Sequence, residues 1–103
     1  MMHILVLDHD HTNALAHAIQ LSGYGLVVET VQDIEEAALR LSTMEFDAVL
    51  CNVDNSNDLY RVRLFQLQET CPGTDFYTRE QFGEFFGRFE MDKPGKGGDR
   101  LTG

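Results

Sequence analysis

Two short apolar runs constrain the fold of this chain more strongly than any other feature of its sequence. Residues 4–7 read Ile-Leu-Val-Leu and residues 48–51 read Ala-Val-Leu-Cys, with no polar residue in either run. A strand with one face in water alternates apolar and polar residues, whereas a strand of a parallel sheet is covered on both faces and is continuously apolar. We therefore expect residues 3–8 and 48–53 to form strands of a parallel sheet.

Helical spacing of apolar residues separates these strands. We predict helices over residues 12–22, 33–44 and 58–70, a further strand over residues 26–30 and a short strand over residues 75–78. The side chains expected to face inward are Leu15, Ala18, Ile19 and Ser22 in the first helix, Ile34, Ala37, Ala38, Leu41 and Met44 in the second, and Leu59, Val62 and Phe65 in the third. This alternation with short loops predicts an α/β fold with a doubly wound parallel sheet of four or five strands.

The regular pattern weakens after Gly73. A short amphipathic helix is predicted by four phenylalanines at i, i+3, i+4 and i+7, which are Phe82, Phe85, Phe86 and Phe89. Such a stripe is expected to pack into the core, and the alternative is a partner or dimer interface. Residues 95–103 are rich in glycine and are expected to form a flexible tail or linker, which leaves residues 1–94 as the domain.

Composition excludes several classes of function. The 103 residues carry a net charge of −9 without any Lys/Arg cluster, so nucleic-acid binding through this domain is not expected. No apolar run is long enough to cross a membrane and no basic-then-apolar leader opens the chain, so we expect a cytoplasmic protein. Cys51 and Cys71 are too few for a disulfide scaffold and are expected to be reduced.

Polar residues follow the two predicted central strands. Asp8, His9 and Asp10 end the first, and Asn52 and Asp54 lie at and just beyond the end of the second. The carboxyl ends of parallel strands meet at one rim, where ligands bind in open α/β sheets. Clustered carboxyl oxygens there suit a hard cation such as Mg²⁺. The alternative for Asp10 is that it only caps the following helix.

In order and spacing, these elements resemble the receiver domain of two-component response regulators. The resembling segments are Ile4-Leu-Val-Leu-Asp8, Leu21-Ser-Gly-Tyr24, Glu35-Glu-Ala-Ala38 and Phe46-Asp-Ala-Val-Leu-Cys-Asn52, with weaker matches at Thr78 and Lys93-Pro94. The resemblance is good over residues 1–74 and weak over residues 75–94. It implies a flavodoxin-like (CheY-like) fold and a role in cytoplasmic signal transduction.

The resemblance also implies a role for each position at the rim. In receivers, an aspartate that ends the third strand accepts a phosphoryl group, and an acidic pair after the first strand holds Mg²⁺. Asp8 matches the first acid of that pair, His9 stands at the second, and Asn52 stands at the phospho-acceptor position. Thr78 matches the switch hydroxyl and Lys93 matches the lysine that contacts the phosphoryl oxygens.

The departures from this pattern predict a degenerate pseudo-receiver. The Asn52 amide is neutral and poorly nucleophilic, so it cannot form an acyl phosphate. Because His9 stands in place of the second acid, the metal site has one negative charge fewer, and Mg²⁺ at Asp8 and Asp10 should bind weakly at most. No other cofactor is expected. Asp54 lies beyond the strand end, outside the position that phosphoryl attack requires.

The C-terminal third departs further. Lys93 lies only 15 positions after Thr78, fewer than a receiver uses for its fourth helix and fifth strand, and Glu90 stands where receivers place a switch aromatic. We therefore expect a reduced or rearranged receiver. Its exposed sheet edge would favour coverage by a partner protein or a second copy.

Three functional hypotheses follow. The first is a non-phosphorylatable signalling module, not an enzyme, that acts through protein–protein interaction or as a homodimer. The second is a metal-binding module that uses His3, His9 and His11 with Asp8 or Asp10. The third is a receiver inactivated by substitution at position 52, whose activity Asn52→Asp would restore; we predict that this repair fails. No nucleophile–base pairing, P-loop or dinucleotide fingerprint is present.

Overall fold

A computed structural model describes residues 2–52 and 58–91 of the chain. The elements in chain order are β1 (His3–Asp8), α1 (His11–Ser22), β2 (Val27–Val31), α2 (Ile34–Thr43), β3 (Ala48–Asn52), α3 (Asp58–Thr70), β4 (Asp75–Thr78), the 3₁₀ helix η1 (Arg79–Gln81) and α4 (Phe82–Met91). Asp54, Lys93 and the predicted tail at residues 95–103 lie outside the described residues. No helix in the described part of the chain is long and apolar enough to cross a membrane.

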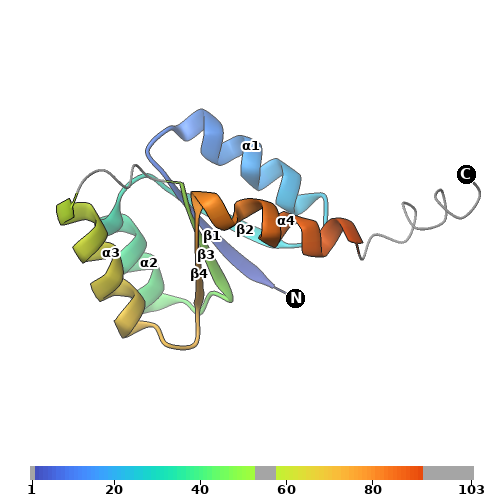
Figure 1. Cartoon of the computed structure of the whole chain (residues 1–103). Helices are drawn as coiled ribbons and strands as arrows, with labels where there is room; N and C mark the ends of the chain where they lie inside the picture. Colours follow the sequence, from blue (N-terminus) through green and yellow to red (C-terminus); the bar gives the residue numbers. More distant parts are fainter. Residues whose placement is uncertain (1, 53–57, 92–103) are drawn as a thin grey trace, which may run out of the picture.

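The described strands form one four-stranded parallel sheet in the order β2-β1-β3-β4 (Figure 1). The two continuous apolar runs form the central strands β1 and β3, as predicted, because only there are both faces of a strand covered. Their register pairs Leu5 with Val49 and Asp8 with Asn52. The α/β fold predicted from the sequence, with a flavodoxin-like strand order, is therefore confirmed.

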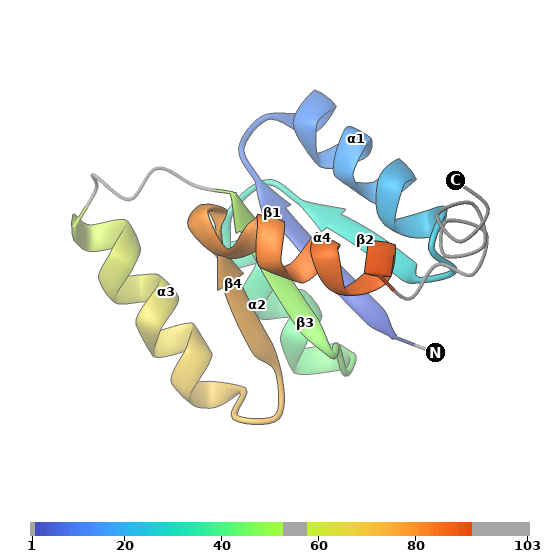
Figure 2. The same cartoon turned by 45° about the vertical axis from the view of Figure 1, so that its right-hand side comes forward.

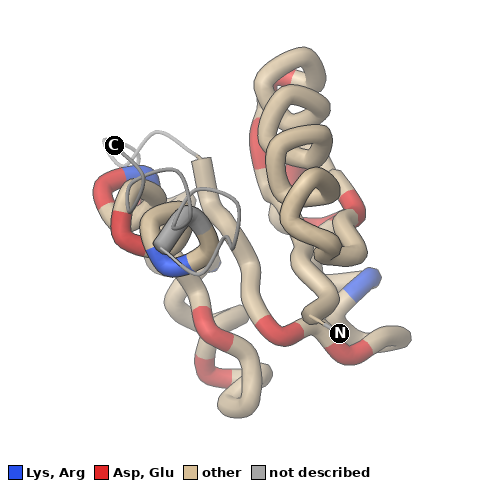
Figure 3. Tube along the Cα trace, turned by 90° about the vertical axis from the view of Figure 1, so that its right-hand side faces the viewer, with Lys and Arg blue, Asp and Glu red and all other residues tan. Residues whose placement is uncertain are grey.

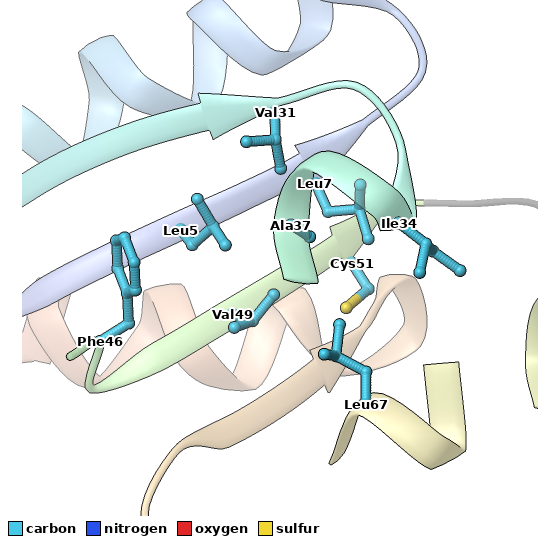
Figure 4. Packing of buried hydrophobic residues seen from close by; sticks show 9 residues of the cluster. All are labelled: Leu5, Leu7, Val31, Ile34, Ala37, Phe46, Val49, Cys51 and Leu67. Carbon is cyan, nitrogen blue, oxygen red and sulfur yellow. The ribbon is translucent and has the colours of Figure 1, made fainter. Parts of the chain in front are cut away.

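Helices cover both faces of the sheet, so the domain has three layers. Helices α2 and α3 lie on one face and α1 and α4 on the other (Figures 1 and 2). Successive strand residues point to opposite faces, which divides the core into two clusters. The α2–α3 cluster contains Leu5, Leu7, Val31, Ile34, Ala37, Phe46, Val49, Cys51 and Leu67 (Figure 4). The α1–α4 cluster contains Ile4, Val6, Ala14, Leu21, Ala48, Leu50, Phe82 and Phe85.

The inward faces of two helices differ from the prediction. In α3, Leu59, Val62 and Phe65 are 68%, 53% and 60% exposed, whereas the packed side chains are Tyr60, Leu64 and Leu67. Helix α3 carries apolar residues on two adjacent sides, and only its docking onto the sheet selects one of them. In α1, Ala14 and Leu21 are buried, whereas Leu15 and Ile19 are exposed.

The described part of the C-terminal third consists of β4, η1 and α4. From β4 the chain passes through η1 directly into α4, which packs on the α1 side of the sheet. Phe85 is fully buried there, with its ring centroid 4.8 Å from that of Tyr77 in β4 and 5.0 Å from that of Phe89. The expectation that the stripe packs into the core is therefore confirmed for Phe82 and Phe85, and the interface alternative does not hold for these two residues. Phe86 and Phe89 are half-buried at the margin of the same cluster.

Candidate functional site

Three polar side chains from three different strand ends meet at the carboxyl rim of the sheet. Asp8 is the last residue of β1, Asn52 is the last residue of β3, and Arg79 directly follows β4. Parallel pairing places Asp8 opposite Asn52, and pairing of Cys51 with Thr78 brings the end of β4 alongside. The strand register thus creates this site from residues that are far apart in the sequence.

The three side chains form a continuous relay of hydrogen bonds. The Asn52 Nδ2 donates to Asp8 Oδ2 at 2.7 Å, and the Arg79 Nε donates to Asn52 Oδ1 at 2.6 Å. The other carboxylate oxygen, Asp8 Oδ1, accepts the backbone N–H of Asp10 at 2.9 Å. Asp8 is the one charged residue in the buried part of the described structure, at 3% exposure. Such a carboxylate requires hydrogen-bond donors, and the relay provides them.

The chemistry of its neighbours determines the orientation of the Asn52 amide. An ionised carboxylate only accepts hydrogen bonds, and a guanidinium only donates them. The amide must therefore direct its NH₂ group toward Asp8 and its carbonyl oxygen toward Arg79. Turning the amide by 180° would place two acceptors against each other at Asp8 and two donors against each other at Arg79.

The site does not fit the Mg²⁺ ion that the receiver resemblance implies. A bound Mg²⁺ needs oxygen ligands at about 2.0–2.1 Å in near-octahedral geometry. The Asp8 oxygen that faces Asn52 meets an NH₂ donor instead of a second oxygen. The Asp10 Oδ1 caps α1 by accepting the backbone N–H groups of Thr12 and Asn13 at 2.9 and 3.3 Å. The capping alternative for Asp10 is therefore the one observed.

The histidines do not assemble a metal centre either. His3 lies at the start of β1, where its Nε2 is 3.0 Å from Glu29 Oε2, whereas His9 follows the opposite end of that strand. The His9 ring packs edge-on against the Tyr60 ring, with centroids 5.2 Å apart. Residues 2–52 and 58–91 contain no group of three His, Cys, Asp or Glu side chains placed to share a metal ion. His3 is therefore placed apart from His9, and the described residues offer no supporting geometry for the hypothesis of a metal site at His3, His9 and His11 with Asp8 or Asp10.

Thr78, the position of the switch hydroxyl in the receiver resemblance, contacts Gln81 at the end of η1. Its backbone N–H donates to Gln81 Oε1 at 2.9 Å, and its Oγ1 lies 3.3 Å from the same atom. These contacts help to start η1 and hence α4. Arg79 is a residue of the candidate site that was not predicted from the sequence. Its position directly after a predicted strand was the available signal, because polar residues at the carboxyl ends of parallel strands share one rim.

A second surface feature lies between α3 and the end of β4. An open groove of about 790 Å³ is lined by Asp58, Arg61, Val62, Leu64, Phe65, Gln68, Thr78 and Glu80. The exposed Val62 and Phe65 make part of it apolar. The groove borders β4, which is an edge strand of the described sheet.

Comparison with known proteins leaves the family of this chain open. No protein-family model matches the sequence, and no curated protein is found as a relative.

Proposed function

We propose that this chain is a non-phosphorylatable, receiver-like signalling module that acts through contacts with other proteins and is not an enzyme. The observation that carries the proposal is the Asn52 side chain, which ends β3 and is hydrogen-bonded at both of its polar atoms to Asp8 and Arg79. The proposal also uses the receiver resemblance of residues 1–74.

The chemistry of the relay argues against phosphoryl transfer to position 52. An acyl phosphate forms when an ionised carboxylate attacks the phosphorus atom, and an amide oxygen lacks the charge and nucleophilicity for that attack. The Asn52 oxygen is also engaged by Arg79 at 2.6 Å. Asp10 Oδ1 serves as a helix cap, and residues 2–52 and 58–91 contain no group of three His, Cys, Asp or Glu side chains placed to hold the cation that neutralises a phosphodonor.

Surface features support a protein as the partner. Helix α3 exposes Leu59, Val62 and Phe65 next to the groove beside β4. The chain has 17 acidic and 8 basic residues, and acidic positions are spread along the described trace (Figure 3). With a net charge of −9, the chain lacks the basic surface that nucleic-acid binding requires. A cytoplasmic location belongs to the same proposal.

The proposal is tested with a phosphodonor and a phosphoryl analogue. Amide ¹H–¹⁵N spectra of the full chain are recorded with and without Mg²⁺ plus beryllofluoride, and acetyl phosphate treatment is followed by intact-mass spectrometry. We expect unchanged spectra and no phosphoryl adduct. An acid-labile, hydroxylamine-sensitive phosphoryl adduct on the wild-type chain would overturn the proposal.

The Asn52→Asp variant separates a degenerate module from a receiver inactivated by a single substitution. We expect the variant to remain unphosphorylated, because Arg79 would pair with the new carboxylate and no second metal-binding acid is in place. Phosphoryl uptake by Asn52→Asp, absent in Asn52→Gln, would instead favour the inactivated receiver. Sedimentation of the wild-type chain over a range of concentrations then shows whether the chain associates with a second copy of itself.

A further inference from the structure

We infer that Arg79 is the resident cation of the rim site and that, by orienting the Asn52 amide, it keeps divalent metal ions away from Asp8. This inference concerns the same site as the proposed function. It rests on that proposal only in assigning the site to a signalling module, and the role of Arg79 in metal binding is argued separately. The carrying observation is the relay Asp8–Asn52–Arg79, in which one amide separates a buried carboxylate from a guanidinium.

Electrostatics explains why the relay is stable as it stands. The Asp8 carboxylate is 3% exposed and needs hydrogen-bond donors, which a nearby positive charge can orient. The Asn52 amide aligns its dipole between the two charges, with its NH₂ end toward Asp8 and its oxygen end toward Arg79. Each group thus meets its complement, and each Asp8 carboxylate oxygen has a hydrogen-bond donor without a metal ion.

Loss of Arg79 would change which atom of the Asn52 amide faces Asp8. Without the guanidinium, the amide is free to turn and place its Oδ1 beside Asp8 Oδ2. A carboxylate oxygen and an amide oxygen, completed by water molecules, are ligands that Mg²⁺ and Mn²⁺ accept. Arg79 is therefore a positioning residue, since it acts on the metal preference of Asp8 through Asn52.

Three arginine variants of the full chain test this role. Arg79→Met removes the donor, and Arg79→Lys retains both a donor and the charge. Arg88→Met is the matched control, because it removes the same charge from α4, where Arg88 Nη1 donates to the Tyr77 hydroxyl at 2.8 Å. Mn²⁺ is the probe, and the readout is paramagnetic broadening of individual backbone amide signals.

We expect Arg79→Met to bind Mn²⁺ at least about tenfold more tightly than wild type, the scale on which neighbours of metal ligands tune affinity. Broadening should be centred on the amides of Asp8, Asp10 and Asn52. Arg79→Lys and Arg88→Met should behave like wild type. Adding Asp8→Asn to Arg79→Met should abolish the gain, and Mg²⁺ should compete with Mn²⁺ at the same signals.

Two results would overturn the inference. One is saturable Mn²⁺ binding at Asp8 in the wild-type chain with the affinity of Arg79→Met, and the other is a folded Arg79→Met variant with no gain. Dispersed signals from Phe82 and Phe85 report that α4 is in place, and Arg79→Ala, which also lacks a donor, replaces the methionine variant if it unfolds. Phosphorylation of the wild-type chain would overturn the proposed function while leaving this metal-binding comparison intact, so the two failures are distinguishable.

Discussion

The Asn52 amide nitrogen lies 2.7 Å from a carboxylate oxygen of Asp8, and the two residues stand opposite each other at the ends of β3 and β1. Asp8 and Asn52 lie where the two central strands of the sheet reach its carboxyl rim. Because Asp8 is buried, the stability of the domain depends on the hydrogen-bond donors that reach the Asp8 carboxylate. The pair is therefore a structural element of the fold as well as the candidate site.

Asn52→Ala should destabilise the domain measurably. It leaves one oxygen of the buried Asp8 carboxylate without its side-chain donor, which costs about 1–3 kcal/mol of unfolding free energy. Urea denaturation followed by circular dichroism measures the change. Asn13→Ala is the matched control, because Asn13 is exposed on α1, and its effect should stay within about 0.5 kcal/mol. Equal effects of the two substitutions would contradict the structural role of the pair.

Phe85→Ala and Phe65→Ala compare the same substitution at a buried and an exposed site. Phe85 is 0% exposed in the α1–α4 cluster, so its loss should cost about 3–5 kcal/mol. Phe65 is 60% exposed on α3, and its substitution should change the unfolding free energy by less than about 1 kcal/mol. Chemical denaturation of both variants would show whether α4 belongs to the core. A small effect at Phe85 would mean that α4 is not docked on the sheet.

His17→Phe should stabilise the domain. The His17 ring stacks on Phe86 and meets Phe82 edge-on, with centroids 5.8 and 5.5 Å away. Its Nδ1 atom is buried and finds no hydrogen-bond partner among the described residues. Removing this polar atom while keeping the aromatic contacts should add about 1 kcal/mol to the unfolding free energy. His11→Phe, on the exposed first turn of the same helix, serves as the control. A lower melting temperature for His17→Phe would contradict this expectation.

The two cysteines should differ in their reactivity toward thiol reagents. Burial raises the pKa of the Cys51 thiol to about 12, so almost no reactive thiolate is present at pH 8. Cys71 is only partly buried. With DTNB, we expect one thiol to react rapidly in the native protein and the second only after denaturation. Cys71→Ser should remove the rapid phase. A rapid phase that survives in Cys71→Ser would mean that the central strand opens readily.

The rim site was partly predictable from the sequence. The end of a parallel strand can be located from its apolar run, so the meeting of Asp8 and Asn52 followed from pattern alone. The same rule applied to the strand over residues 75–78 would have added Arg79. The hydrogen bond from Arg79 to Asn52 joins residues 27 positions apart, and no local pattern indicates it.

The sequence by itself determined the class of fold, the two central strands and the chemistry available at their ends. These features depend on the local order of apolar residues and on the general geometry of parallel sheets. The tertiary structure alone decided which side of α3 faces the sheet, on which face α4 packs, and that Arg79 donates a hydrogen bond to Asn52. Helix α3 and the phenylalanine stripe each allow more than one packing by their spacing, and only contacts between distant residues select among them. The free energy of burying Leu67 and Phe85 is gained in one arrangement of the whole domain, and that arrangement brings Asp8, Asn52 and Arg79 together.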